Sequence, residues 1–265
     1  MSKTTKKGGS LGEALRSVFT VGVMIIAFII SYVIYKYVFG NPLFFEGGNP
    51  EGHPLPGNYL AIIYKGGVIV PFLIMLNLIL VIFAVERGIV LFRAKGKGRL
   101  NVFVKNLQVS LDNNKIEDAI VACDKQRGSL ANVMKAGLLR YRALQNDATL
   151  EKDQKILALQ KEFEEASALE LPMLSRNLVI LSTIASISVL TGLMGTVIGM
   201  IKAFGALAQA GAPDALALAN GISEALINTA FGIFGSLLAI VLYNFYSTQI
   251  DSFTYKIEHN GRKKL

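Results

Sequence analysis

The sequence predicts an all-α, polytopic membrane protein with four transmembrane helices. Hydrophobic residues make up 52% of the 265-residue chain and charged residues 17%, whereas about a quarter of the residues in a typical soluble domain are charged. The apolar residues gather in four runs that contain no charged side chain, at residues 17–35, 66–85, 177–201 and 225–250. Each run has the length of about 20 residues that a helix needs to cross the hydrocarbon core of a bilayer.

These runs divide the chain into nine segments. The first run follows several lysines, as the core of a signal peptide does, but no small-x-small cleavage site closes it, so we predict a retained helix. In order, we predict a basic cytoplasmic N-terminus (1–16), an extra transmembrane helix 1 (17–39), a periplasmic loop (40–65), transmembrane helix 2 (66–92), a cytoplasmic helical domain (93–175), transmembrane helix 3 (176–204), a periplasmic turn (205–215), transmembrane helix 4 (216–250) and a cytoplasmic tail (251–265).

The basic residues lie mainly on one side of the predicted membrane. They precede the first run and follow the second and fourth runs, whereas Lys65 is the only basic residue in the predicted loop 40–65. The positive-inside rule therefore predicts that both termini and residues 93–170 are cytoplasmic. This sorting also explains the net charge of +8, so no nucleic-acid partner is expected.

Residues 100–175 are predicted to form helices with polar faces that extend into the cytoplasm. Helix breaks are predicted at residues 111–115 and 126–129, where the apolar periodicity is interrupted. Strong helix formers then continue from Leu150 into the third apolar run without a capping glycine. We expect one helix over residues 150–205, about 80 Å long, although Pro172 can kink it.

The sequence carries no recognisable catalytic pattern. It contains no Walker loop, no GxSxG motif and no cluster of paired histidines and carboxylates. His53 and His259 are predicted on opposite sides of the membrane, so they cannot form a metal site together. Cys123 is the single cysteine, which excludes an intramolecular disulfide, and it is predicted to be a small buried apolar residue. We therefore expect neither an enzyme nor a cofactor.

Small residues form stripes on the third and fourth predicted membrane helices. Small side chains let membrane helices approach closely, so the stripes predict tight helix packing. The stripes include Ser188, Gly192, Gly195 and Gly199 on the third helix, and Gly232 and Gly235 on the fourth.

Glu224 is the unusual residue of the fourth predicted helix. It lies ten residues after Asp214, within an otherwise apolar run, where a carboxylate costs about 2–4 kcal/mol and usually faces a cavity or a partner. Asn228 lies one turn further along, and Thr196 on the third helix can face the same interior. The alternative is that Glu224 lies near enough to the surface to be hydrated, or caps a helix. We expect the long side chain of Lys202 to extend to the membrane interface.

Two motifs resemble those of the MotA/TolQ/ExbB proton channel family, in its ExbB/TolQ branch. They are GLMGTVIGM at residues 192–200 and GISEALINTAFG at residues 221–232. Further matches are Glu86-Arg87 at the end of a helix, residues 119–138, and Tyr243-Asn244. The resemblance covers roughly residues 66–251, and two ordered motifs on consecutive helices make it specific.

The resemblance implies a ring: a homopentamer in the bacterial inner membrane whose third and fourth helices line a central pore. An ExbD- or TolR-like dimer of single-span proteins occupies such a pore, proton flow turns it, and the motion reaches a TonB- or TolA-like periplasmic protein. By position, Thr196 and Thr229 match the pore-lining threonines and Glu224 matches the intramembrane glutamate. Ser188 and Asn228 are possible neighbours of the pore, and membrane lipids are the remaining partner.

The sequence departs from the family pattern at three positions. Val189, Asn228 and Leu238 stand where the family often has Pro, Ala and Pro, which affects local kinks. The first helix, 17–39, is additional, and we expect it to pack outside the subunit and face lipid. The implied function is a proton-driven motor for outer-membrane transport. Alternatives are TolQ-like envelope maintenance, a gliding or flagellar motor, and a scaffold that does not conduct protons. An autonomous transporter is disfavoured because no inverted repeat is present.

Overall fold

The structure is a computed structural model, and it describes residues 21–50, 52–145, 150–208 and 214–262. Helices and short connections make up these residues, and the described part of the chain contains no strand. The chain divides into two compact units, which are described separately. The first unit comprises residues 1–83 and 180–241, and the second comprises residues 84–179 and 242–265.

Within the described residues, four helical stretches are long and apolar enough to cross a membrane. They are Val21–Phe39, Ile69–Ala94, Lys152–Leu207 and Ala215–Tyr255, so the predicted all-α polytopic fold is confirmed. The first stretch is the least enclosed, because only 11% of its most apolar window is buried inside the chain. Its exposed apolar side chains require cover by lipid or by another protein.

An aromatic cluster orders the connection between the first two membrane stretches in the first unit. The first helix ends in a π-helical turn, Ile34–Phe39 (η1), and two 3-10 turns follow, Pro42–Phe44 (η2) and Glu46–Gly48 (η3). The short helix Tyr59–Tyr64 (α2) then completes what the sequence predicted as an irregular loop.

The aromatic cluster consists of Tyr35, Phe45 and Tyr64. The rings of Tyr35 and Tyr64 are stacked with their centroids 4.7 Å apart, and the Tyr35 hydroxyl donates to the Tyr64 carbonyl oxygen at 3.1 Å. The Phe45 ring meets Tyr64 edge-on at 5.5 Å. These contacts join the end of the first helix to α2.

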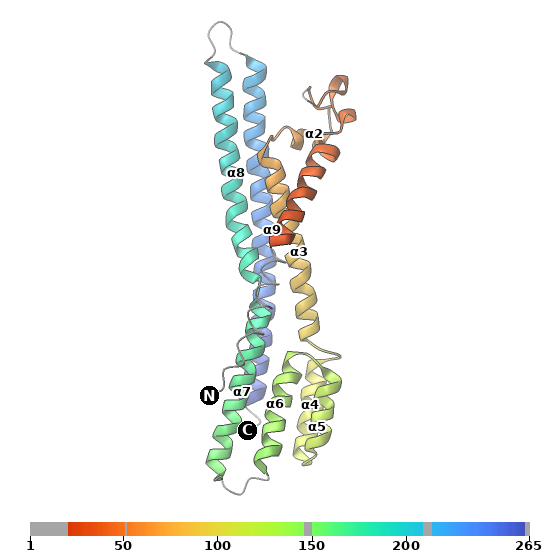
Figure 1. Cartoon of the computed structure of the whole chain (residues 1–265), viewed down its shortest axis with the longest axis vertical. Helices are drawn as coiled ribbons and strands as arrows, with labels where there is room; N and C mark the ends of the chain where they lie inside the picture. The colour runs from red at the N-terminus through yellow and green to blue at the C-terminus, as the bar shows by residue number, and fades with distance from the viewer. Residues whose placement is uncertain (1–20, 51, 146–149, 209–213, 263–265) are drawn as a thin grey trace, which may run out of the picture. The chain divides into compact units, whose positions relative to one another are not determined.

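Three long helices contribute to the first unit: Ile69–Ala94 (α3), Leu178–Leu207 (α8) and Ala215–Arg262 (α9). Within this unit α8 and α9 run side by side (Figure 1). Asp214 caps α9, because its Oδ1 accepts from the amides of Leu216 and Ala217, each at 3.0 Å. Helix α9 thus begins at Ala215, one residue before the predicted start of transmembrane helix 4 at residue 216. The helix continues to Arg262, so most of the segment predicted as a tail is helical.

The second unit contains four shorter helices: Leu100–Asp112 (α4), Ile116–Gln126 (α5), Ser129–Gln145 (α6) and Lys152–Ser175 (α7). Both predicted breaks are confirmed. Asn114 has φ 58° between α4 and α5, and Gly128 has φ 90° between α5 and α6. Asparagine and glycine adopt this left-handed conformation more readily than other residues, which explains why the helices stop there.

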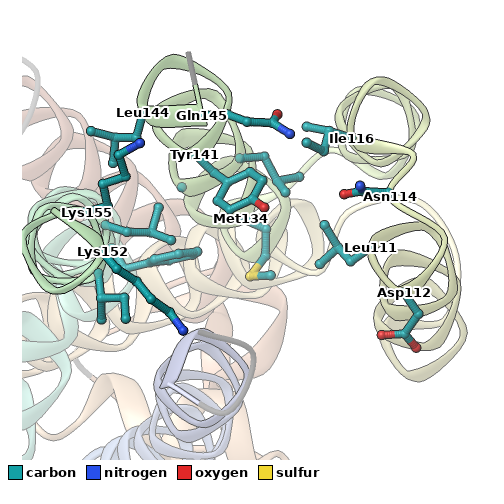
Figure 2. Close-up of a pocket in the computed structure, with 15 residues that line it drawn as sticks. Leu111, Asp112, Asn114, Ile116, Met134, Tyr141, Leu144, Gln145, Lys152 and Lys155 are labelled. Atoms are coloured by element: carbon teal, nitrogen blue, oxygen red, sulfur yellow. The ribbon is translucent and has the colours of Figure 1, made fainter. Parts of the chain in front are cut away.

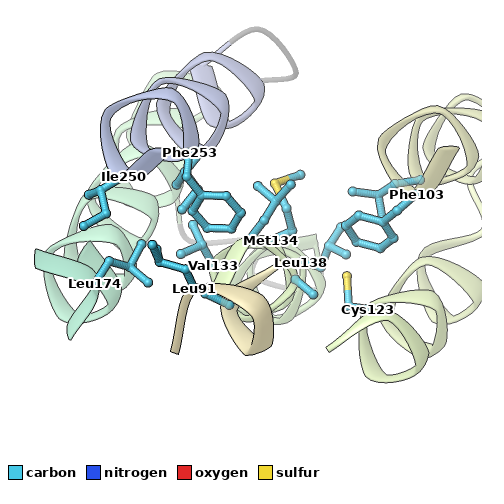
Figure 3. Close-up of a cluster of buried hydrophobic side chains, with 14 of the residues drawn as sticks. Leu91, Phe103, Cys123, Val133, Met134, Leu138, Leu174, Ile250 and Phe253 are labelled. Carbon is cyan, nitrogen blue, oxygen red and sulfur yellow. The ribbon is translucent and has the colours of Figure 1, made fainter. Parts of the chain in front are cut away.

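The core of the second unit is a cluster of buried apolar side chains (Figure 3). It includes Cys123, which is 2% exposed, as predicted. Burial raises the pKa of the Cys123 thiol from 9.0 to about 12, with a smaller contribution from Asp124. Other members of the cluster are Leu91, Phe103, Leu107, Leu130, Val133, Met134, Leu138, Leu174, Ile250, Phe253 and Ile257.

The expectation of one unbroken helix over residues 150–205 is wrong. Helix α7 ends at Ser175, and Asn177 has φ 60° before α8 begins at Leu178. Proline cannot donate a backbone hydrogen bond, and its ring disturbs the turn before it, so Pro172 weakens the last turns of α7. The predicted kink is therefore a break.

The end of α7 is stabilised by a buried side chain from α3. Arg87 is 2% exposed and its Nη1 donates to the carbonyl oxygens of Leu174 at 3.2 Å and Met173 at 3.5 Å. The same guanidinium forms an ion pair with Glu86, 2.5 Å between Arg87 Nη2 and Glu86 Oε1. The Arg87 guanidinium therefore neutralises Glu86 and also satisfies carbonyls that a helix C-terminus leaves unpaired.

Candidate functional site

Glycines bring the backbones of α8 and α9 together in the first unit. A Cβ atom added at Gly199 would lie 2.7 Å from the Gly221 carbonyl oxygen, and one added at Gly232 would lie 2.7 Å from the Ser188 carbonyl oxygen. A Cβ at Gly192 would lie 2.9 Å from the Asn228 carbonyl oxygen. Such distances leave no room for a side chain, so these glycines set the separation of the two helices.

Gly195 and Gly235 make room for polar side chains. A Cβ at Gly195 would overlap the side chain of Asn228, and a Cβ at Gly235 would lie 2.5 Å from Ser188 Oγ and 3.0 Å from Asn77 Nδ2. The glycine stripes predicted from the sequence therefore lie where the helices meet, and each has a definite neighbour.

Thr196 on α8 and Thr229 on α9 lie opposite each other, and their hydroxyl groups are in direct hydrogen-bonding contact. Both hydroxyls also reach the Gly192 carbonyl oxygen, at 3.3 Å from Thr196 Oγ1 and 3.4 Å from Thr229 Oγ1. Thr229 Oγ1 lies 3.2 Å from the Ala225 carbonyl oxygen as well. Both side chains are half-buried.

The two threonine hydroxyls have more acceptor oxygens within reach than they have protons to donate. Each hydroxyl has one proton to donate and lone pairs that accept, so the two threonines can exchange donor and acceptor roles without moving apart. Such a pair of hydroxyls can hydrogen-bond to a neighbouring carboxyl group whether that group is protonated or ionised, and it carries no fixed charge.

Glu224 lies on α9 between the start of the helix at Ala215 and Thr229. It is 9% exposed, which excludes the alternative of a freely hydrated surface residue. Both carboxylate oxygens accept from Lys202 Nζ, at 2.6 Å for Oε1 and 2.9 Å for Oε2. The Lys202 ammonium group thus pairs with Glu224 on the neighbouring helix, a partner that the sequence analysis did not assign to it; its position relative to the membrane interface stays a prediction.

The backbone turn before α3 closes the other side of the Glu224 carboxylate. Gly67 has φ +73°, and a Cβ at this position would overlap Glu224 Oε1. Next to it, the Gly66 carbonyl oxygen accepts from Asn228 Nδ2 at 2.8 Å. The turn Gly66–Gly67 thus contacts two successive polar side chains of α9.

Asn228 and Ser188 lie inside the first unit and not on its surface. Both residues are fully buried, and among the described residues Asn228 Oδ1 and Ser188 Oγ have no hydrogen-bond partner. One chain alone encloses them, in contrast to the half-buried Thr196 and Thr229. The position of Asn228 and Ser188 next to a pore stays a prediction.

The family model for "MotA/TolQ/ExbB proton channel family" matches residues 126–259, just over half of the chain. The chain belongs to this family. The resemblance carried by the two motifs is thereby confirmed, and the matched segment contains Thr196, Lys202, Glu224 and Thr229. It does not include the first helix or the Gly66–Gly67 turn.

Relatives of this family member carry both ExbB and TolQ names. A Tol-Pal system protein TolQ from Pseudomonas aeruginosa is 27% identical over 58% of this chain and 67% of its own length. A biopolymer transport protein ExbB from Salmonella typhimurium is 41% identical over 28% of this chain and 30% of its own length. A putative biopolymer transport protein ExbB-like 3 from Synechocystis is 33% identical over 38% of this chain and 50% of its own length. The similarity to the second and third of these proteins thus covers at most half of their length.

Two parts of the site were missed by sequence reasoning. The sequence singles out Lys202 and Glu224 separately but not as a pair, although both lie within about three helical turns of the connection between α8 and α9. Gly66 and Gly67 were not predicted to belong to the site at all. A glycine pair directly before an apolar run was the available signal, because glycine permits both a left-handed turn and a close contact.

A separate cavity of about 610 Å³ lies in the second unit, lined by residues of α4, α6 and α7 (Figure 2). Its walls are mainly apolar, with Leu111, Met134 and Leu144 among them, and Lys152 and Lys155 also line it. Small-molecule sites add a few convergent polar groups to an apolar wall. The polar groups here do not converge on one point, and we assign no function to this cavity.

Proposed function

We propose that this chain is the channel subunit of a proton-driven motor. With an ExbD-like single-span partner, it converts proton-motive force into mechanical work that energises TonB-dependent transport across the outer membrane. The observation that supports this proposal most directly is the hydroxyl contact between Thr196 and Thr229, next to the buried Glu224, on two apolar helices of a proton channel family member. The role requires no enzymatic reaction and no cofactor.

The proposed proton pathway passes the threonine pair. A carboxyl group of a partner helix must gain and lose a proton in an apolar environment, where a fixed charge is costly. Two hydroxyls that can each donate or accept stabilise both forms of such a carboxyl. Thr196, Glu224 and Thr229 are the residues that we assign to the pathway, with the threonines in direct contact with the partner.

The proposed assembly is a homopentamer in the inner membrane, with α8 and α9 of each subunit around a central pore that holds the partner dimer. Large apolar side chains on these helices support an assembly, since they are strongly exposed in the isolated chain: Leu190, Leu193, Val197, Ile201, Phe204, Leu226 and Leu237. Exposed apolar surface of this extent requires cover by lipid or protein. Both termini and the second predicted connection, residues 93–175, are proposed to be cytoplasmic, on the distribution of Lys and Arg.

A TolQ-like role in envelope maintenance is the second candidate. It is supported by the similarity to a TolQ protein over 58% of this chain. A deletion strain separates the two roles. Loss of uptake of a TonB-dependent ligand with an intact outer membrane supports the ExbB-like role, whereas detergent sensitivity with normal uptake supports the TolQ-like role.

The experiment that tests proton conduction uses the chain purified with its single-span partner and reconstituted in proteoliposomes. Proton influx is followed with an entrapped pH-sensitive dye under an imposed membrane potential. The double variant Thr196→Val, Thr229→Val keeps the shape of both side chains and removes both hydroxyls, so we expect an intact assembly with strongly reduced influx. Unchanged influx in this variant contradicts the proposed pathway, and loss of assembly shows that the hydroxyls are structural.

A further inference from the structure

The Lys202–Glu224 ion pair is not required by a pathway built on the threonines. Lys202 Nζ binds both oxygens of the carboxylate, at 2.6 and 2.9 Å. The two partners differ in burial, because the side chain of Lys202 is 51% exposed and that of Glu224 is 11% exposed. A half-exposed lysine in a membrane helix can extend its ammonium to the interface, yet here it turns to the neighbouring helix.

The surroundings of Glu224 fix the direction of its carboxylate. Gly67 contacts it from the turn before α3, where any side chain would collide with Oε1. Lys65 lies two residues before Gly67 in the chain, and its ammonium lies 5.7 Å from the centre of the Phe45 ring. The carboxylate thus lies between Lys202 of α8 and the turn before α3, and both of its oxygens accept from Lys202 Nζ.

An ammonium at hydrogen-bonding distance favours the charged form of a carboxylate. The pair as a whole carries no net charge, so it can lie near apolar surroundings at a smaller penalty than a lone carboxylate. A carboxylate that is paired with an ammonium in this way does not need to bind a proton to neutralise its charge in apolar surroundings. It is therefore a poor intermediate for a proton that must arrive and leave.

We propose that Lys202 is a positioning residue that keeps Glu224 ionised and directed toward the Gly66–Gly67 turn, so that Glu224 acts as a fixed charge and not as a proton carrier. This inference rests on the proposed proton pathway and restricts the role of Glu224 in it: Glu224 lies beside the pathway but does not itself carry protons. The threonine pair then contacts the partner's titrating carboxyl, while the Lys202–Glu224 pair sets the electrostatic environment at the external end of α8 and α9.

Infrared spectroscopy of the purified chain tests the charge of Glu224 directly. The difference between the wild type and Glu224→Gln should lack the C=O stretching band of a protonated carboxyl at neutral and mildly acidic pH. The difference between Lys202→Met and the double variant Lys202→Met, Glu224→Gln should show that band. A protonated carboxyl in the wild type, or its absence in Lys202→Met, overturns the proposal. If Lys202→Met does not fold, the comparison of the wild type with Glu224→Gln still decides.

Proton influx with the reconstituted partner tests the role. Lys202→Arg keeps the positive charge and should retain influx within about twofold, whereas Lys202→Met should lose about tenfold or more, because the buried Glu224 carboxylate is left without its cation. The matched control is Lys135→Met, which removes a 2.5 Å ion pair with Asp124 in the second unit and should leave influx unchanged. Equal influx in Lys202→Met and the wild type overturns the inference alone, whereas absence of influx in the wild type contradicts the proposed function.

Discussion

Replacement of Gly67 by alanine tests how closely the turn before α3 is fitted to the candidate site. Gly67 has φ +73°, and a Cβ atom at this position would overlap Glu224 Oε1. Gly57 has φ +83° in the same external connection, but a Cβ there would meet nothing within 4 Å. The two glycines therefore share the unfavourable backbone conformation and differ in the contact with Glu224.

The expected magnitudes follow from this difference. An alanine in the left-handed region costs about 1–2 kcal/mol, since Cβ approaches its own carbonyl oxygen, and both variants carry this penalty. Overpacking at a filled position costs about 1–3 kcal/mol, but the atom that Gly67→Ala would meet is the end of the Glu224 side chain, which can rotate away. We therefore take the lower end of that range, about 1 kcal/mol, and expect a loss of about 1–2 kcal/mol for Gly57→Ala and of about 2–3 kcal/mol for Gly67→Ala.

The assay is unfolding of both variants in the same detergent, together with proton influx in proteoliposomes that contain the single-span partner. Gly57→Ala should conduct as the wild type does. Gly67→Ala should unfold more easily than Gly57→Ala and conduct less, because the Glu224 carboxylate is displaced from the turn. Equal stability and equal influx in the two variants would refute the contact between Gly67 and Glu224 as a feature of the working protein.

Three further predictions address other parts of the chain. Glu224→Ala should abolish or strongly impair energised uptake in cells while the assembly stays intact on a sizing column, and normal uptake would contradict its assigned role. Arg87→Met should destabilise the second unit by about 1–3 kcal/mol in a thermal unfolding assay, because the carbonyl oxygens of Met173 and Leu174 lose their side-chain donor. Arg142→Met removes an exposed ion pair with Glu117 and should cost at most about 1 kcal/mol; similar losses would show that burial is unimportant. The Cys123 pKa of about 12, raised by burial from 9.0, predicts slow labelling by a maleimide in the folded chain at neutral pH and fast labelling after unfolding. Because the folded pKa is the higher one, the stability linked to this thiol is complete below pH 9 and is lost as the pH rises toward 12.

Sequence reasoning reached the main architecture because the bilayer imposes a simple requirement. Four uncharged runs of sufficient length predict four helices almost regardless of their packing, and the structure contains them. The two motifs also predicted that Thr196 and Thr229 belong to one site, since each motif has a fixed register on its helix. The hydroxyl contact between them agrees with that register.

The remaining parts depend on contacts that one sequence does not specify. The Lys202–Glu224 pair requires the register of α8 against α9, and the contact of Gly67 with Glu224 requires the position of a turn more than 150 residues earlier in the chain. A stripe of small residues predicts that helices pack, but not which neighbour each residue meets, so the burial of Ser188 and Asn228 within one chain was not predicted. The break at Asn177 depends on the left-handed backbone conformation of this one residue. The residues on both sides favour helix, so the sequence alone did not indicate a break there.

The aromatic cluster has a consequence for chimeric subunits. A Cβ atom at Gly40 would lie 2.5 Å from the ring of Tyr64, and the Tyr35 hydroxyl binds the Tyr64 carbonyl oxygen. The first helix and α2 are thus shaped to each other, although neither lies in the segment that defines the family. If the first helix of another subunit were joined before Gly40, its side chains would not fit the contact surface that Tyr64 provides in this chain. If the exchange were made after Tyr64, the first helix and its contact surface on α2 would be transferred together.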